Sequence, residues 1–149
     1  MAGLSPKLPL SRDSRDGFAL NKTYQDTIQQ NFKNLLLTAP GERVMIPEFG
    51  VGLRNYLFEN QDVSTYEEIE ENIRKQVLVY MPFVTIGEIK FLQNEISGPA
   101  QGRPSDYKVL NNNISYDPEL APHRLNISIS YYIEALAIYD LLEVSVDLS

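Results

Sequence analysis

The spacing of the apolar residues changes at Pro82 from a helical period to a strand period. Before this proline, apolar residues recur every three or four positions, as they do in helices with one buried face. After it, apolar and polar residues alternate, which is typical of antiparallel strands with one polar face. Because the helices precede the strands, the sequence predicts an α+β fold, with N-terminal helices packed on a C-terminal antiparallel sheet.

The first helix is predicted over residues 23–37. Asn21 or Thr23 can cap its start, and Pro40-Gly41 closes its end. One apolar stripe along this helix is expected to face the core, and it consists of Tyr24, Ile28, Phe32, Leu35 and Leu36.

The second helix is predicted over residues 65–81, and Pro82 ends it. Ser64 and Glu67 have the spacing of a capping box. The acidic run at residues 67–71 is interpreted as a solvated first turn, because carboxylates are favourable near a helix N-terminus. The buried stripe is expected to comprise Tyr66, Ile69, Ile73, Val77 and Tyr80.

Beyond Pro82, a strand is predicted over residues 84–91. Val84 and Ile86 have one parity, whereas Ile89 and Phe91 have the other. A β-bulge at Gly87 would place all four side chains on the same face. Residues 97–106 are predicted to form a loop, and a weaker strand region over residues 107–116 is interrupted by three asparagines at 111–113. Two cleanly alternating strands follow at residues 125–133 and 142–148.

Residues 1–16 are predicted to form an extended N-terminal arm, and residues 17–149 a single α+β domain. Pro6 and Pro9 should prevent regular structure in the arm, and it has few apolar anchors. The arm is therefore expected to be mobile or to be ordered by a partner.

Composition excludes several classes of function. A net charge of −7 disfavours nucleic-acid binding, which needs clustered Lys and Arg. The longest apolar runs are far shorter than the ~20 residues of a membrane span, and no signal-peptide core is present. The chain has no cysteine, so it can have no disulfide or thiolate metal site. The expected partners are proteins.

The residues offer little for catalysis. His123 is the single histidine, and no metal or phosphate-binding motif occurs. Glu48 and Glu59 are the one carboxylate pair that could be nominated for a glycoside hydrolase. The favoured alternative is a structural hydrogen bond or ion pair between Glu48 and Arg43 or Arg54. No catalytic residue, cofactor or metal ligand is predicted.

The segment from residue 41 to residue 60 carries a family resemblance. It contains Gly41-Glu42-Arg43, then Pro47-Glu48-Phe49-Gly50, then Leu57-Phe58-Glu59-Asn60. This series resembles the baseplate-wedge, sheath-initiating family of contractile-tailed phages and related injection machines. The likeness covers residues 35–91, and extends more loosely through the later strands. Arg43 and Glu48 are expected to hold the corner at residues 41–50, to which Gly41, Pro47, Phe49 and Gly50 also belong.

The resemblance implies a structural virion protein of the tail baseplate, assembled in the host cytoplasm, and not an enzyme. Its partners would be the tail sheath protein and other baseplate wedge proteins, and a six-fold baseplate would hold six copies. The first sheath ring would add strands to its sheet by β-strand addition. The residues expected at that contact are Asn126, Ser128, Ser130, Leu142, Val144, Val146 and Leu148.

In the resembled family, the long helix ends in a Glu-Pro-Arg triplet that contacts the wedge core. The corresponding residues here are Met81, Pro82 and Phe83, so a hydrophobic and less salt-sensitive contact is expected. Two alternatives stay open. One is the equivalent subunit of a bacterial injection or type VI secretion machine, and the other is a lysozyme-like hydrolase.

Overall fold

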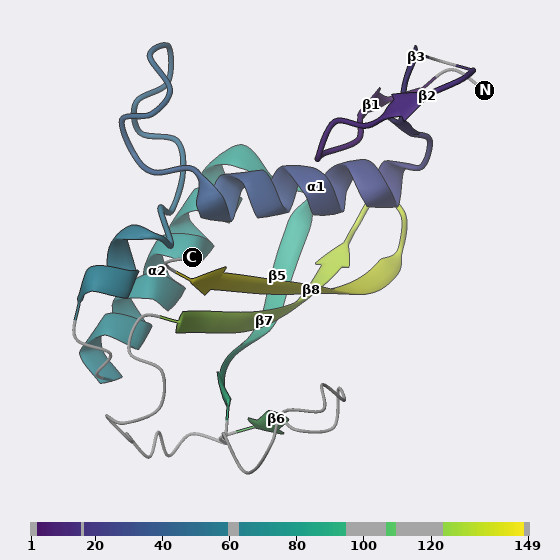
Figure 1. The fold of residues 1–149 in the computed structure, drawn as a ribbon. Coiled ribbons are helices and arrows are strands. Elements are labelled where there is room, and N and C mark those ends of the chain that lie inside the picture. The colour runs from purple at the N-terminus through teal and green to yellow at the C-terminus, as the bar shows by residue number, and fades with distance from the viewer. Residues whose placement is uncertain (1–2, 16, 60–62, 95–106, 110–123, 148–149) are drawn as a thin grey trace, which may run out of the picture.

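Two helices pack against one face of an antiparallel sheet in the computed structural model, which describes residues 3–15, 17–59, 63–94, 107–109 and 124–147 (Figure 1). The predicted α+β fold is confirmed. In chain order the elements are β1 (Ser5–Pro6), β2 (Arg12–Asp13), β3 (Gly17–Phe18), β4 (Leu20–Asn21), α1 (Tyr24–Leu37), η1 (Asn55–Phe58), α2 (Val63–Tyr80), β5 (Val84–Asn94), β6 (Tyr107–Val109), β7 (Arg124–Ile133) and β8 (Ile138–Asp147).

Helix α1 has the predicted limits, and Thr23 is its cap. The Thr23 hydroxyl accepts a hydrogen bond from the Asp26 backbone N–H at 3.1 Å, whereas Asn21 lies in β4. The stripe is buried only in its later part, at Phe32, Leu35 and Leu36. Tyr24 is 65% exposed, so its assignment to the buried face was wrong: the core lies under the later turns of the helix and not under its first residue.

Helix α2 begins at Val63, two residues before the predicted start. Ser64 therefore lies inside the first turn, and the predicted capping box is misplaced. The predicted stripe is buried at Tyr66, Ile69, Ile73 and Val77, with Tyr80 partly buried. The acidic run is solvated as expected, but it lies after the first turn of α2, which contains no acidic residue. Glu70 and Glu71 form exposed ion pairs with Arg74 and Lys75, at 2.8 and 3.1 Å.

The main sheet has the strand order β6-β5-β7-β8, and every described pairing is antiparallel. The predicted β-bulge is confirmed. Ile86 lies opposite Tyr131 and Ile89 opposite Ile129, so two residues of β5 face Ser130 alone. The Ser130 hydroxyl accepts from the Glu88 N–H at 2.9 Å and donates to the Glu88 carbonyl at 3.2 Å. Ile86 and Ile89 both pack against the core as a result.

Strand β7 matches its predicted limits, but β8 starts four residues earlier than predicted. Tyr139 and Leu141 are apolar residues on the exposed face, and they mask the alternation at the start of β8. The expected loop at 97–106, the asparagine turn at 111–113, His123 and Leu148 lie outside the described residues.

The arm contains short antiparallel pairs, so the expectation that its prolines prevent regular structure is wrong at Pro6. β1 pairs with β4, and β2 pairs with β3. The Leu4 and Lys7 N–H groups donate to the Asn21 and Ala19 carbonyls, both at 2.8 Å, so the N–H that proline lacks is not required. Gln30 ties the pair to α1 by accepting from the Leu8 N–H and donating to the Pro6 carbonyl.

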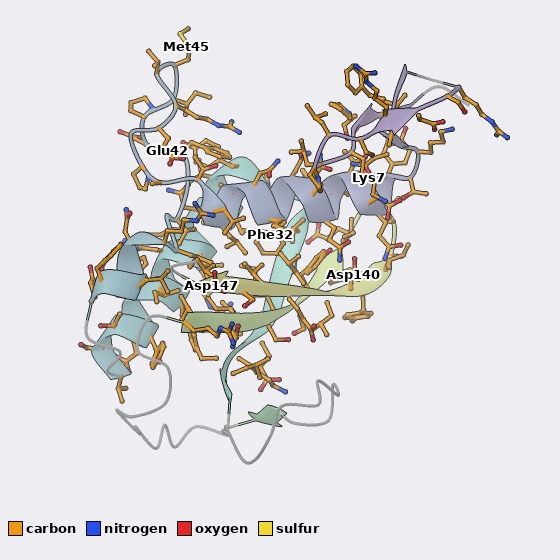
Figure 2. The ribbon with its side chains drawn as sticks, viewed as in Figure 1. Lys7, Phe32, Glu42, Met45, Asp140 and Asp147 are labelled. Atoms are coloured by element: carbon orange, nitrogen blue, oxygen red, sulfur yellow. The ribbon has the colours of Figure 1, made fainter. Side chains whose placement is uncertain are left out.

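A single hydrophobic core joins both helices, η1 and the inner face of the sheet. Phe32 of α1 meets Tyr131 of β7 edge to face, with ring centroids 5.3 Å apart. Figure 2 shows Phe32 directed from α1 toward the sheet. Among the described residues, no helix is both long and apolar enough to cross a membrane.

Candidate partner-binding surfaces

The corner at residues 41–50 projects from the end of α1 as a closed loop (Figure 1). The Gly41 N–H donates to the Pro47 carbonyl at 2.7 Å, and the Phe49 N–H to the Ile46 carbonyl at 3.2 Å. After the loop, the Val51 and Leu53 N–H groups donate to the Leu35 and Leu36 carbonyls. The chain that leaves the corner therefore satisfies carbonyls that the last turn of α1 leaves without helical partners.

Gly50 is the most constrained position of the corner. Its φ is +110°, and a Cβ placed there would lie 2.1 Å from the Thr38 carbonyl oxygen. A residue with a side chain would meet both a backbone clash and a disfavoured conformation. Gly41 also has a positive φ, +92°, but its added Cβ would meet no atom within 4 Å.

Gln76 of α2 clamps the corner, a role that the sequence did not predict. Its side-chain amide donates to the Glu48 carbonyl at 3.0 Å and accepts from the Gly50 N–H at 3.0 Å. One planar amide thus satisfies a donor and an acceptor two residues apart. Gln76 lies beside the buried stripe of α2, where a glutamine gives no distinctive sequence signal.

Arg43 and Glu48 do not hold the corner through an ion pair. The Arg43 guanidinium carbon lies 3.7 Å from the centroid of the Phe49 ring, and that ring meets Tyr80 edge to face at 4.9 Å. Among the described residues, neither Arg43 nor Arg54 forms an ion pair with Glu48. Glu48 is exposed and contributes its backbone carbonyl instead. The expected ion pair is corrected to a cation–π contact.

The tip of the corner exposes large apolar side chains. Val44 is 92% exposed and Met45 is 91% exposed, and Figure 2 shows Met45 at the far end of the loop. Single exposed apolar residues are ordinary on protein surfaces, but two consecutive ones at the end of an internally hydrogen-bonded loop form a candidate protein contact.

The expected wedge contact at residues 81–83 is only partly available. Met81 is 5% exposed and belongs to the core, so it is corrected to a structural residue. Its N–H continues the α2 ladder to Val77, which turns the side chain inward. Pro82 and Phe83 are exposed. Large exposed apolar side chains nearby are Leu78 and Val79 of α2.

The residues expected at the sheath contact lie on two strands and on two faces. Leu142, Val144 and Val146 are at most 3% exposed and face the core, so their side chains are not free to bind a partner. Asn126, Ser128 and Ser130 lie on the other face of β7, which is an inner strand paired on both sides. The expected strand addition would use backbone groups, and β7 has no open edge for it because β5 and β8 occupy both of its sides, so of these two strands only β8 could accept a strand.

Strand β8 is an edge strand, and no described strand pairs with its outer side. Leu141 lies opposite Ser130, and its backbone N–H and carbonyl bond to the side chains of Asp140 and Gln29, which indicates that both groups point to the outer side of the strand. Residues two apart point the same way in an antiparallel ladder, so Glu143 and Ser145 also direct their N–H and carbonyl groups outward. Two close contacts fit this parity: the Ser145 hydroxyl donates to Asn126 Oδ1 at 2.6 Å, and the rings of Tyr132 and Tyr139 meet at a tilt of 43° with centroids 4.6 Å apart.

An open groove of about 620 Å³ runs between this edge and α1. Its α1 wall is polar and includes Gln29 and Lys33, and its opposite wall is formed by Leu141, Leu142 and Glu143. Lys7 and Leu8 of the arm close one end. The groove therefore lies beside β8 at residues 141–143, and it is open to solvent.

Neither carboxylate nominated for hydrolysis lies in an apolar pocket, because Glu48 and Glu59 are both exposed. A glycosidase acid needs an environment that keeps it protonated, and solvent exposure does not provide one. Within the described part of the chain, no cluster of His, Asp or Glu could hold a metal ion.

Comparison with known proteins gives one family and a shared fold. The family model described as baseplate wedge protein gp25 matches residues 22–123. A Geobacter sulfurreducens protein provisionally described as a tail lysozyme superposes with a TM-score of 0.60 at 21% identity, over 88% of this chain and 96% of that one. A chain of the anti-feeding prophage baseplate gives a TM-score of 0.51 at 21% identity, over 69% and 78% of the two chains. No curated protein sequence matches.

Proposed function

The chain belongs to the baseplate wedge protein gp25 family, and we propose that it starts sheath assembly in a contractile tail by offering the outer edge of β8 to a strand of the first sheath ring. The family match confirms the resemblance carried by the corner and supports a structural role in the baseplate. The observation that carries the finer proposal is the unpaired edge of β8 beside an open groove.

An exposed edge strand is a hazard for a soluble protein, because its unpaired N–H and carbonyl groups can recruit other chains. β8 is ten residues long, and three of its side chains are anchored in the core. A rigid edge of this kind suits strand addition, in which backbone hydrogen bonds supply affinity. The occupant that we propose is an extended arm of the sheath protein.

A second surface would hold the subunit in the wedge. Phe83, together with Leu78 and Val79, exposes apolar area at the end of α2. We propose that this surface binds other baseplate proteins through hydrophobic contact, which ionic strength would weaken little. Six copies would follow from a six-fold baseplate, and the anti-feeding prophage baseplate was resolved with six-fold symmetry.

The equivalent role in a bacterial injection machine is a related candidate, because a baseplate chain of the anti-feeding prophage shares the fold. Both readings use the same edge, and they differ in the particle that is assembled. Hydrolysis is the weaker alternative, and the exposure of Glu48 and Glu59 counts against it. A peptidoglycan turbidity assay with Glu48→Gln as the control variant tests it directly.

The decisive experiment is an assembly reaction followed by electron microscopy. Baseplates purified without this chain are mixed with the matching sheath subunit, with or without the added protein. We expect sheath rings to begin at the baseplate only when the protein is present. Equal sheath formation in both reactions would refute initiation and leave an internal wedge role.

A further inference from the structure

The outer edge of β8 differs between its first and second halves. At Leu141, side chains already occupy both backbone groups. The N–H donates to Asp140 Oδ1 at 2.9 Å, and the carbonyl accepts from Gln29 Nε2 at 3.5 Å. The second of these bonds is long and weak, so Asp140 is the principal cap.

Asp140 is itself held in place by its neighbours. Its Oδ2 accepts the Tyr131 hydroxyl at 2.7 Å, and Gln25 of α1 also bonds to its side chain. Burial alone would raise the pKa of Asp140, but the bonds from Tyr131, Gln25 and Leu141 outweigh it, so the pKa is lowered. The ionised carboxylate is an acceptor with several donors around it, and such charge-assisted bonds are strong. Figure 2 shows Asp140 near the start of β8.

Glu143 and Ser145 lack such caps. Among the described residues, no side chain accepts from their outward N–H groups or donates to their outward carbonyls. The groove opens beside Glu143. An added strand can bond to them without displacing a protein group. To bond to Leu141, it would first have to break the Asp140 cap.

We propose that the acceptor site for an added strand begins at Glu143 and runs toward the end of β8, and that the Asp140 cap on Leu141, backed by Gln29, stops the added strand there and fixes its register. This inference rests on the proposed function for the identity of the occupant, a sheath arm. The difference between the capped Leu141 and the uncapped Glu143 and Ser145 is a property of the free protein. Stopping the strand at one residue matters, because a slip of one residue would turn every side chain of the added strand to the opposite face.

The free protein provides the first test, by amide hydrogen exchange measured by NMR on the full chain. We expect the Leu141 amide to exchange at least about tenfold more slowly than those of Glu143 and Ser145, as one good hydrogen bond would produce. In Asp140→Ala, the Leu141 amide should approach the rate of Ser145. Equal rates at Leu141 and Ser145 in the unsubstituted protein would overturn the inference.

Paired proline variants provide the second test, with purified matching sheath subunit as the probe. Proline removes an outward N–H without breaking the ladder to β7, so Leu141→Pro and Ser145→Pro should keep the fold. We expect Ser145→Pro to weaken sheath binding at least about tenfold and Leu141→Pro to change it less than about twofold. Amide exchange of β7 reports whether each variant is folded, and a variant that fails this check is replaced by the Asp140→Ala exchange measurement above.

The two possible failures are distinguishable. Equal loss of binding in both folded proline variants would refute the stop at Leu141 and leave strand addition intact. No binding by the unsubstituted protein would refute the sheath as occupant, and the exchange rates of the free protein would still decide whether Leu141 is capped.

Discussion

The corner at residues 41–50 and the outer edge of β8 present opposite parts of the chain to solvent. In the corner, the Gly41 and Phe49 N–H groups donate to carbonyls of the same loop, and the apolar side chains of Val44 and Met45 are exposed. Along β8, alternate side chains are buried and the backbone of Glu143 and Ser145 points outward. A side-chain surface needs particular residues at particular positions, whereas a backbone surface needs only an alternating strand.

The largest effect is expected from Gly50→Ala in the corner. The new Cβ would meet the Thr38 carbonyl oxygen at 2.1 Å, with φ at +110°. Positive φ and overpacking together should lower the free energy of unfolding by about 4 kcal/mol. Urea unfolding measures this. Gly41→Ala is the matched control and should lose only about 1–2 kcal/mol, because its site is open. Similar losses at both positions would show that the clash is relieved.

Neighbouring leucines test the parity of β8. Leu142 is 3% exposed and Leu141 is 50% exposed. Leu142→Ala should cost about 3 kcal/mol through the cavity that it leaves. Leu141→Ala should stay within about 0.5 kcal/mol, as most exposed substitutions do. Thermal and urea unfolding of both variants check this. A larger loss for Leu141→Ala than for Leu142→Ala would show that Leu141, and not Leu142, faces the core.

Gln76→Ala should loosen the corner without removing any corner residue. It leaves the Gly50 N–H and the Glu48 carbonyl without their partner, which should cost about 2 kcal/mol in the free energy of unfolding. Lys75→Ala removes only the exposed pair with Glu71 and should cost less than about 0.5 kcal/mol. Amide exchange at Gly50 should rise in Gln76→Ala alone. An unchanged exchange rate at Gly50 would show that Gln76 does not stabilise the corner.

A smaller effect is expected in the acid stability of the β8 edge. The pKa of Asp140 is lowered in the folded protein, so its ionised form stabilises folding above the unfolded-state pKa of about 3.9. That stabilisation should be lost as the pH falls through the lower pKa of the folded state. Urea unfolding between pH 2 and pH 7 should show this component in the unsubstituted protein and not in Asp140→Asn. Identical pH profiles would contradict it.

The smallest effect is expected at Arg43. Arg43→Ala removes an exposed cation–π contact with Phe49 and should cost about 0.5–1 kcal/mol. Glu48→Gln should change the free energy of unfolding by less than about 0.5 kcal/mol, because the side chain of Glu48 supports no ion pair with Arg43. A double-mutant cycle between these two positions should give no coupling energy. A clear coupling energy would support the ion pair between Arg43 and Glu48 that the sequence suggested.

The sequence predicted the parts of the fold that periodicity controls. Both helices, the bulge at Gly87 and strand β7 follow directly from the spacing of apolar residues. Helix α2 begins two residues before its predicted start, and the start of β8 was displaced because an exposed apolar pair hides the alternation there.

The binding surfaces were harder to predict, because they depend on which way a group points. Met81 and Phe83 are two residues apart and have similar chemistry, yet Met81 is buried and Phe83 is 39% exposed. Gln76 bonds to Gly50 and Glu48, which precede it by 26 and 28 positions in the sequence, and no local pattern marks such a contact. The family resemblance indicated strand addition at the terminal strand, but not which of its residues direct their N–H and carbonyl groups outward.

The bulge in β5 also bears on where this chain could lose a residue. Gly87 and Glu88 together oppose Ser130, so β5 contains one residue more than its partner needs. Losing that residue would restore a regular ladder and leave Ile86 and the former Ile89 on the core side, at the cost of the two bonds to the Ser130 hydroxyl. Elsewhere in β7 or β8, a one-residue deletion would turn the following side chains out of the core. A single-residue deletion should therefore be tolerated at Gly87 more readily than elsewhere in β5, β7 or β8.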